Sequence, residues 1–180
     1  PWPLHKTSPK GAWQRFSHGL GVGDINGDGK MDFLDKDGWW EQPASVSGDP
    51  IWKEHKFTFA PGAAQMYGYD VNNDGLNDVI TCLDAHNYGL VWYEQYRDNG
   101  DIKFKQHVIM NKEPKDSKYG VKFSQPHAID LVDMDGDGLK DIVTGKRFWA
   151  HGPSGDSEPN APAVLYWFKL VRNADKTVDY

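Results

Sequence analysis

Three short acidic segments carry oxygen-bearing side chains at one fixed spacing. Aspartate stands at positions 1, 5 and 9, asparagine or aspartate at position 3, and glycine at position 6. Calcium takes about six to eight oxygen ligands, and these side chains can converge on one ion together with the carbonyl at position 7. The expected ligands are Asp24, Asn26, Asp28, Lys30 and Asp32; Asp70, Asn72, Asp74, Leu76 and Asp78; and Asp133, Asp135, Asp137, Leu139 and Asp141.

Two other interpretations of these loops need to be weighed. An EF-hand requires an acid at position 12 and flanking helices, whereas position 12 is Asp35, Thr81 and Thr144 and the flanks have strand patterns. Metal-free turns rich in Asp and Asn are the second alternative. Three copies with identical ligand spacing favour calcium, and the third loop, with four carboxylates, should bind it most tightly.

Four histidines form a second group with chemical capacity. His18 and His127 each stand six residues before a first loop aspartate, and His86 and His151 lie between later expected strands. Two to four of them near Asp130 could bind zinc or another transition metal, which would act as a Lewis acid. The alternative is that these histidines cap strands or hydrogen-bond to loops. The recurrent residues His5, His55 and His107 indicate a repeated structural role instead.

Aromatic residues suggest a rival kind of site. The side chains of Tyr67, Tyr88 and Trp149 could stack on the apolar faces of sugar rings. Lysines in the loop before His127 either attract an anionic ligand such as a uronate or simply face solvent; they are Lys112, Lys115, Lys118 and Lys122. Four strand tryptophans are expected in the core between repeats, namely Trp39, Trp40, Trp92 and Trp167.

The elements that position these residues repeat with the acidic loops. Each loop is followed by an apolar β-type stretch and an aromatic strand, and another strand ends in histidine: Trp2–His5, Trp52–His55 and Phe104–His107. Four strands per repeat predict an all-β fold of propeller-type blades with four antiparallel strands each. The 180 residues are expected to form one domain, with repeat units of about 1–49, 50–99 and 100–180.

The phase of the repeat predicts about three blades. If the strand before each loop is innermost, each His-ending strand is the outermost strand of the preceding blade, and the third blade's outer strand starts near 177–180. A closed propeller has about four to eight blades. Either further residues at both ends or other copies of the chain should therefore complete the ring.

The pattern Asp-x-[Asp/Asn]-x-Asp-Gly-x-x-Asp between strands resembles the FG-GAP/VCBS repeat family of integrin-type propellers and secreted bacterial proteins. That resemblance implies calcium and a secreted, periplasmic or cell-surface location. The Phe-Gly and Gly-Ala-Pro pieces of the family are poorly kept, so the repeats are divergent. A fainter resemblance to the propeller of aldos-2-ulose dehydratase concerns His127 alone.

Charge and composition narrow the function classes. The net charge is −6, and ten of the 26 carboxylates lie in the three loops, so three bound dications would neutralise the chain. No basic face suggests nucleic acid, no apolar run suggests a membrane span, and a single cysteine excludes an internal disulfide. The first hypothesis is a module that recognises a glycan or protein ligand. The alternatives are a metal-dependent carbohydrate-active lyase, dehydratase or isomerase, and a structural spacer.

Overall fold

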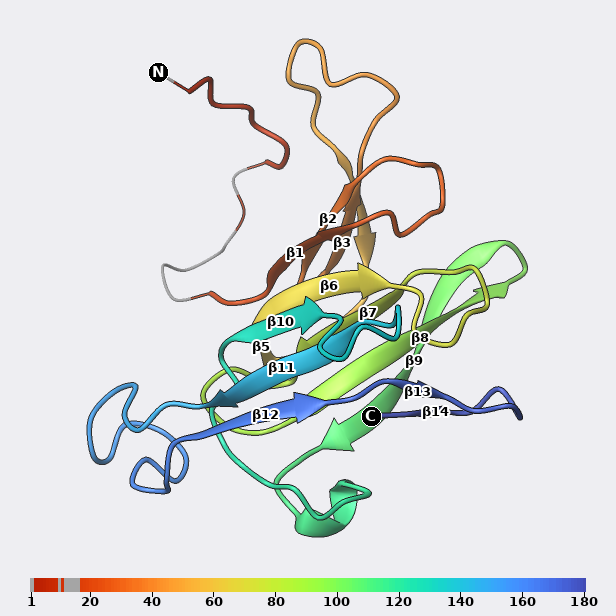
Figure 1. The fold of residues 1–180 in the computed structure, drawn as a ribbon. Coiled ribbons are helices and arrows are strands. Elements are labelled where there is room, and N and C mark those ends of the chain that lie inside the picture. The colour runs from red at the N-terminus through yellow and green to blue at the C-terminus, as the bar shows by residue number, and fades with distance from the viewer. Residues whose placement is uncertain (1, 10, 12–16) are drawn as a thin grey trace.

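The computed structural model describes residues 2–9, 11 and 17–180, and nearly all of its regular structure is β (Figure 1). A 3-10 turn at Pro114–Asp116 is the only helical element among the described residues. The strands are β1 (Leu20–Gly23), β2 (Asp32–Asp35), β3 (Gly38–Glu41), β4 (Lys53–Lys56), β5 (Gly62–Ala63), β6 (Gln65–Tyr69), β7 (Asp78–Cys82), β8 (Leu90–Asp98), β9 (Asp101–Met110), β10 (Ile129–Val132), β11 (Asp141–Lys146), β12 (Val164–Phe168), β13 (Val171–Arg172) and β14 (Val178–Asp179).

The first two blades are four-stranded antiparallel meanders. The first blade is β1–β4 and the second is β6–β9, each with consecutive strands paired. Their inner strands β1 and β6 pair in parallel, which joins both blades into one eight-stranded sheet. This junction requires glycine at position 21, because a Cβ there would lie 2.0 Å from the carbonyl oxygen of Met66.

The third blade is shorter but follows the same plan. Strands β10, β11 and β12 pair antiparallel, and the chain continues into a small hairpin of β13 and β14. Strand β14 begins at Val178, close to where the sequence repeat placed the start of this blade's outer strand, although it pairs with β13 and not with β12. The architecture is that of a partial β-propeller, as predicted, with about three blades.

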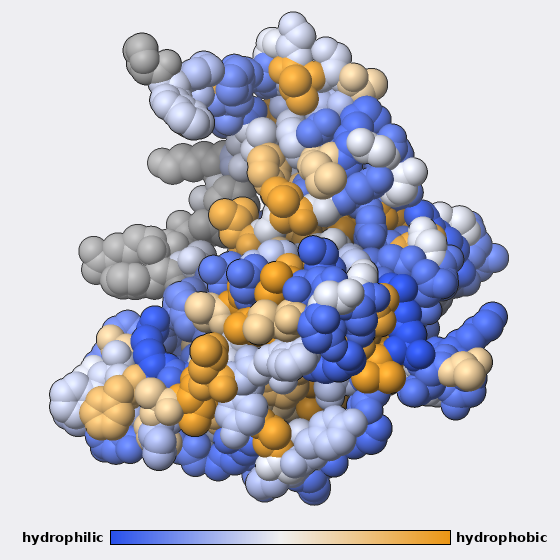
Figure 2. Space-filling view, in the orientation of Figure 1, coloured by the Kyte–Doolittle hydropathy of each residue, from blue (hydrophilic) through white to orange (hydrophobic). Residues whose placement is uncertain are grey.

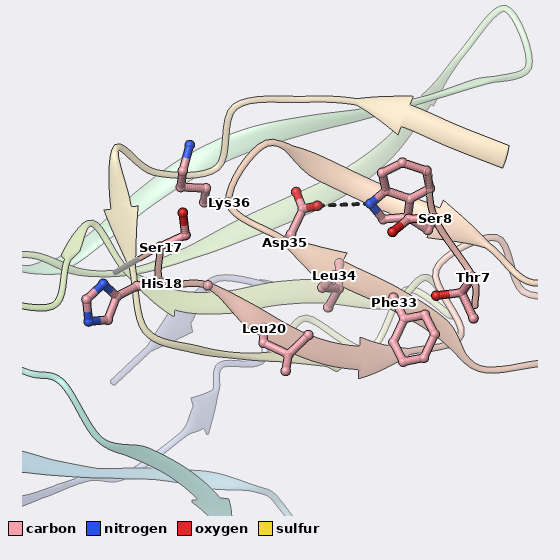
Figure 3. Close-up of a pocket in the computed structure, with 11 residues that line it drawn as sticks. Thr7, Ser8, Ser17, His18, Leu20, Phe33, Leu34, Asp35 and Lys36 are labelled. Carbon is pink, nitrogen blue, oxygen red and sulfur yellow. Dashed lines mark hydrogen bonds between the residues drawn. The ribbon is translucent and has the colours of Figure 1, made fainter. Parts of the chain in front are cut away.

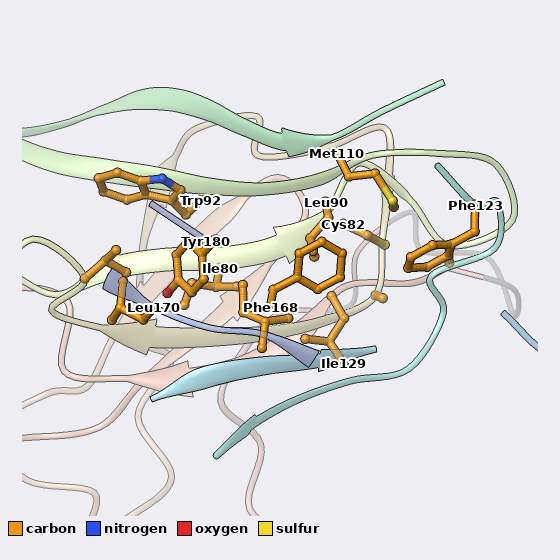
Figure 4. Close-up of a cluster of buried hydrophobic side chains, with 14 residues drawn as sticks. Ile80, Cys82, Leu90, Trp92, Met110, Phe123, Ile129, Phe168, Leu170 and Tyr180 are labelled. Atoms are coloured by element: carbon orange, nitrogen blue, oxygen red, sulfur yellow. The ribbon is translucent and has the colours of Figure 1, made fainter. Parts of the chain in front are cut away.

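Two apolar cores lie between successive blades. One joins the first and second blades around Leu34, Trp39, Met66 and Tyr93. The other joins the second and third blades and includes Ile80, Trp92, Ile142, Phe168 and Tyr180 (Figure 4). In the second blade, alternating side chains of β7 and β8 enter opposite cores, for example Val79 and Ile80, as a strand buried on both faces requires.

The outward face of the third blade has no such covering among the described residues. Trp167 is 44% exposed, whereas its repeat equivalents Trp39 and Trp92 are 3% and 7% exposed. Leu165 is likewise exposed, and apolar side chains are visible on the part of the surface where β11 and β12 run (Figure 2). The expectation that Trp167 lies in a core is therefore wrong within this chain.

The repeated strand histidines hold a structural arrangement in two of the three repeats. His55 stacks on Trp39 with ring centroids 4.0 Å apart, and its Nε2 lies 2.7 Å from Glu41. His107 stacks on Trp92 with ring centroids 4.3 Å apart, and its Nε2 lies 2.7 Å from Glu94. Residues 2–5, in contrast, are not part of a strand, so the prediction of an outer strand at Trp2–His5 is wrong.

Candidate metal centres

The three acidic loops occupy equivalent places in the three blades. They connect β1 to β2, β6 to β7 and β10 to β11, so strands flank all three. In each loop the carboxylate at position 1 accepts hydrogen bonds from backbone N–H groups later in the loop, for example from Gly29 to Asp24, from Gly75 to Asp70 and from Gly138 to Asp133, at 2.9–3.0 Å. The glycine at position 6 has a φ of 84–89° in all three, which other residues rarely adopt.

The aspartate at position 9 joins the loop to the blade. In the second loop, Asp78 is fully buried and accepts one hydrogen bond from the backbone N–H of Val71 and one from that of Gln95. Asp32 and Asp141 make the equivalent pairs of contacts. Burial raises the pKa of Asp78 to about 7, although the two N–H donors act in the opposite direction. A dication beside it would favour the charged carboxylate.

The third loop gathers its oxygens most closely. Asp133, Asp135 and Asp141 each have an oxygen within 4.8 Å of the others, as a cation site requires. The ammonium group of Lys169 contacts Asp135 and lies 3.0 Å from Asp137. The backbone N–H of Leu139 and this ammonium hold the pKa of Asp137 below its usual value. A dication entering this loop would therefore have to displace a lysine.

Arginine side chains tie the first and second loops to the next blade, a contact that sequence reasoning missed. Arg97 of the second blade donates to the carbonyl of Asn26 in the first loop, at 3.0 Å. Arg172 of the third blade donates to the carbonyls of Asp70 and Val71 in the second loop. Both arginines follow the repeated strand tryptophan by five residues. That regular spacing is the sequence signal that could have revealed them.

Three of the four singled-out histidines meet at the end of the inner strands opposite to the acidic loops. The Nε2 of His18, just before β1, lies 3.1 Å from the Nε2 of His127, just before β10. The Nε2 of His86, from the loop between β7 and β8, lies 3.3 Å from that of His18. We call these three residues the histidine centre. Catalytic zinc sites have three protein ligands, such as three imidazole nitrogens, and leave the fourth coordination position to water or substrate. The histidine centre offers three such nitrogens.

The surroundings of the histidine centre favour neutral imidazole. Burial and the positive charge of Arg147 lower the pKa of His127, and a neutral ring nitrogen is the form that binds a metal. A hollow of about 250 Å³ adjoins the centre and is lined by His18, His127 and Gln65 among others. His18 also stands at the edge of a second hollow, of about 440 Å³, over the first blade (Figure 3). A small ligand could therefore reach the nitrogens.

The other predicted site residues are dispersed around this centre. His151 does not share the meeting point of the three Nε2 atoms, but it contacts the ring of His86, with centroids 4.7 Å apart. Asp130 is exposed on β10 and accepts a hydrogen bond from its neighbour Leu131, at 2.8 Å. It lies with Tyr67 in a separate hollow.

The aromatic residues expected to bind sugars have separate surroundings. Tyr67 donates its hydroxyl to the carbonyl of Ile129 at 2.9 Å. Burial and a hydrogen bond to Glu158 raise the pKa of Tyr88 to about 12. Trp149 is half exposed beside Phe148, with ring centroids 5.2 Å apart. Among the described residues, no ring contact joins the three predicted side chains to one another.

Two of the four lysines expected to attract an anion have partners. Lys118 contacts Asp179, and Lys122 lies 2.6 Å from Glu158. Lys112 and Lys115 are exposed. The loop therefore offers less free positive charge than its sequence indicated.

Comparison with known proteins identifies the repeat itself. Residues 70–144 match the FG-GAP-like repeat family, a segment that contains both the second and the third acidic loop. A comparison with curated proteins gave no match. No helix in the described part of the chain is long and apolar enough to cross a membrane. FG-GAP repeats are typical of extracellular and surface domains. Residues 70–144 of this chain are therefore a repeat segment of the FG-GAP type, in a β-propeller-like fold.

Proposed function

We propose that this chain is part of a secreted β-propeller module whose histidine centre binds a divalent transition metal such as zinc. The observation that supports this is the convergence of three Nε2 atoms, 3.1 Å from His18 to His127 and 3.3 Å from His18 to His86. The three rings come from segments far apart in the sequence, so local chain geometry does not explain their meeting. A bound metal would supply Lewis acidity towards an oxygen-bearing ligand.

The ligand class that fits this centre is a small polar molecule such as a keto-sugar or uronate. The adjoining hollow is lined by Gln65, Gly19 and Ala64 beside the two histidines. Arg147 is exposed near His127 and has no carboxylate partner among the described residues. These groups favour a metal-dependent enzyme of the lyase, dehydratase or isomerase type over a structural spacer.

Metal content after gel filtration tests the proposal directly. Wild-type protein, loaded with zinc and freed of excess, should retain one transition metal ion per chain beyond its calcium. His127→Ala should lose that ion because two imidazoles hold it far more weakly than three. His5→Ala is the matched control, since His5 is exposed and, within the described part of the chain, is bonded only to Asp49. Wild-type protein without retained metal would overturn the proposal.

Glycan recognition is the second candidate function, and one observation favours it. Phe148 and Trp149 present adjacent exposed rings on the long loop before β12, and such rings stack on sugars. Binding to a glycan array that is lost in Trp149→Ala but kept in Tyr67→Phe would support it. Equal binding by Trp149→Ala would remove this candidate.

Two further features of the module belong to the same proposal. We propose that the three acidic loops hold calcium, because their turns are built alike and the third gathers three carboxylates. We also propose that a further blade, from the same polypeptide or another copy, covers the third blade. Met134 is 50% exposed there, whereas its repeat equivalents Ile25 and Val71 are 1% and 0% exposed.

A further inference from the structure

One carboxylate beside the histidine centre has an unusual environment. The side chain of Asp156 is only 3% exposed, although it belongs to the long loop between β11 and β12. Its Oδ1 lies 3.2 Å from the Nδ1 of His86 and 3.0 Å from the Nδ1 of His151. The carboxylate thus stands between a ring of the histidine centre and a ring outside it.

The position of Asp156 determines what His86 can do. The Nε2 of His86 faces His18, so Nδ1 is the ring nitrogen left over. That Nδ1 is buried and has no aligned hydrogen-bond partner in the described part of the chain, and the Asp156 oxygen is 3.2 Å away. A small rotation of either side chain would complete the bond. With its proton on Nδ1, His86 presents the Nε2 lone pair to the centre.

The loop that carries Asp156 is fixed at several points. Ser124 and Gln125 donate side-chain hydrogen bonds to the carbonyl of Ser157, at 2.8 and 3.1 Å. The hydroxyl of Ser157 contacts Asn87, next to His86. Lys122 forms an ion pair with Glu158, the residue that follows Ser157. The carboxylate is therefore held in place through the two residues that follow it, Ser157 and Glu158, as precise orientation of a ligand ring requires.

We propose that Asp156 is the positioning residue of the histidine centre, which holds the proton on Nδ1 of His86 and so directs its Nε2 to the metal. This inference rests on the proposed function. Carboxylates that hold metal-bound histidines in this way contribute about 10–100-fold in metal affinity. The long loop before β12 thereby brings a carboxylate to a site whose three histidines come from all three blades.

Competition titrations with a zinc indicator test the inference. Asp156→Asn should weaken zinc binding by about 10–100-fold and shift the visible spectrum of the cobalt-substituted protein, because the ring of His86 is no longer held. Asp156→Glu should recover part of the affinity. Asp101→Asn, the same change at an exposed carboxylate on β9, is the matched control, and His151→Ala removes the other partner of Asp156; both should bind zinc like the wild type.

The outcomes separate this inference from the proposed function. If the wild type binds no transition metal, the proposed function is contradicted. If the wild type binds zinc and Asp156→Asn binds it with the same affinity, only the inference is contradicted. A second zinc ion that is lost in His151→Ala would also overturn it, because Asp156 would then be a direct ligand. If Asp156→Asn does not fold, nitrogen-15 NMR of the zinc-loaded wild type decides: a proton on Nε2 of His86 would contradict the assignment.

Discussion

At the scale of single residues, Lys146 is a buried charged side chain that holds a functional loop. It is 3% exposed, and its ammonium group donates to the carbonyls of Arg147, Phe148, Pro159 and Ala161 at 2.9–3.3 Å. Buried ammonium groups are tolerated when their hydrogen bonds are satisfied. Lys146 thus ties both ends of the loop that carries His151 and Asp156 to the end of β11.

Lys146→Met should loosen that loop and destabilise the protein. The substitution leaves four partly buried carbonyls without this donor, which costs about 1–3 kcal/mol in the free energy of unfolding. Urea denaturation measures this change, and limited proteolysis should show faster cleavage within 147–161. Lys140→Met, at an exposed position in the third loop, should change neither. An unaltered urea midpoint for Lys146→Met would refute the role given to this lysine.

At the scale of elements, each blade uses the same third strand against a different neighbour. Trp39 and Trp92 stand at the same repeat position and lie in the two cores between blades. Trp167 has the same place in β12 but no blade beyond it among the described residues. The contribution of this tryptophan to the free energy of unfolding therefore depends on whether a further blade covers it.

Trp92→Ala and Trp167→Ala should differ strongly in the isolated chain. Truncation of a buried Trp92 costs about 3–5 kcal/mol in unfolding free energy, because the core between the second and third blades is left with a cavity. Trp167→Ala should stay within about 1 kcal/mol of the wild type. Chemical denaturation of both variants measures the difference. A large loss for Trp167→Ala would mean that another copy already covers this face in solution.

At the scale of the whole molecule, the acidic loops concentrate like charge on one end of the blades. The three loops carry ten carboxylates, whereas the net charge of the whole chain is only −6. Few described cations lie beside these carboxylates, chiefly Lys30 near Asp28 and Lys169 near Asp137. Bound dications would remove this repulsion and would bind the folded state only, so they add to stability by mass action.

Calcium removal should therefore lower the melting temperature. A calcium concentration of about 100 Kd stabilises by about 2.7 kcal/mol per site, and each kcal/mol corresponds to about 2–4 °C for a chain of this size. Differential scanning calorimetry in excess EGTA should show a fall of several degrees or more. Re-addition of calcium should restore the original value, and magnesium should do so poorly. The same melting temperature in calcium and in EGTA would contradict calcium binding by the loops.

The sequence by itself determined the blades. The spacing of the acidic loops and the aromatic strands depends on short stretches of chain, and local turn geometry and strand alternation follow from such stretches directly. The loops, the strand order and the phase of the third blade were predicted for this reason. The strand at Trp2–His5 and the burial of Trp167 were predicted wrongly, because both depend on the neighbour that an element packs against.

Only the tertiary structure decided which functional side chains meet. The sequence proposed that two to four histidines converge near Asp130, and the structure brings together His18, His86 and His127, adds Asp156 and leaves Asp130 in a separate hollow. The physical reason is that these contacts join segments far apart in the chain, so they are fixed by how the blades pack and where the long loops return, which no local spacing encodes.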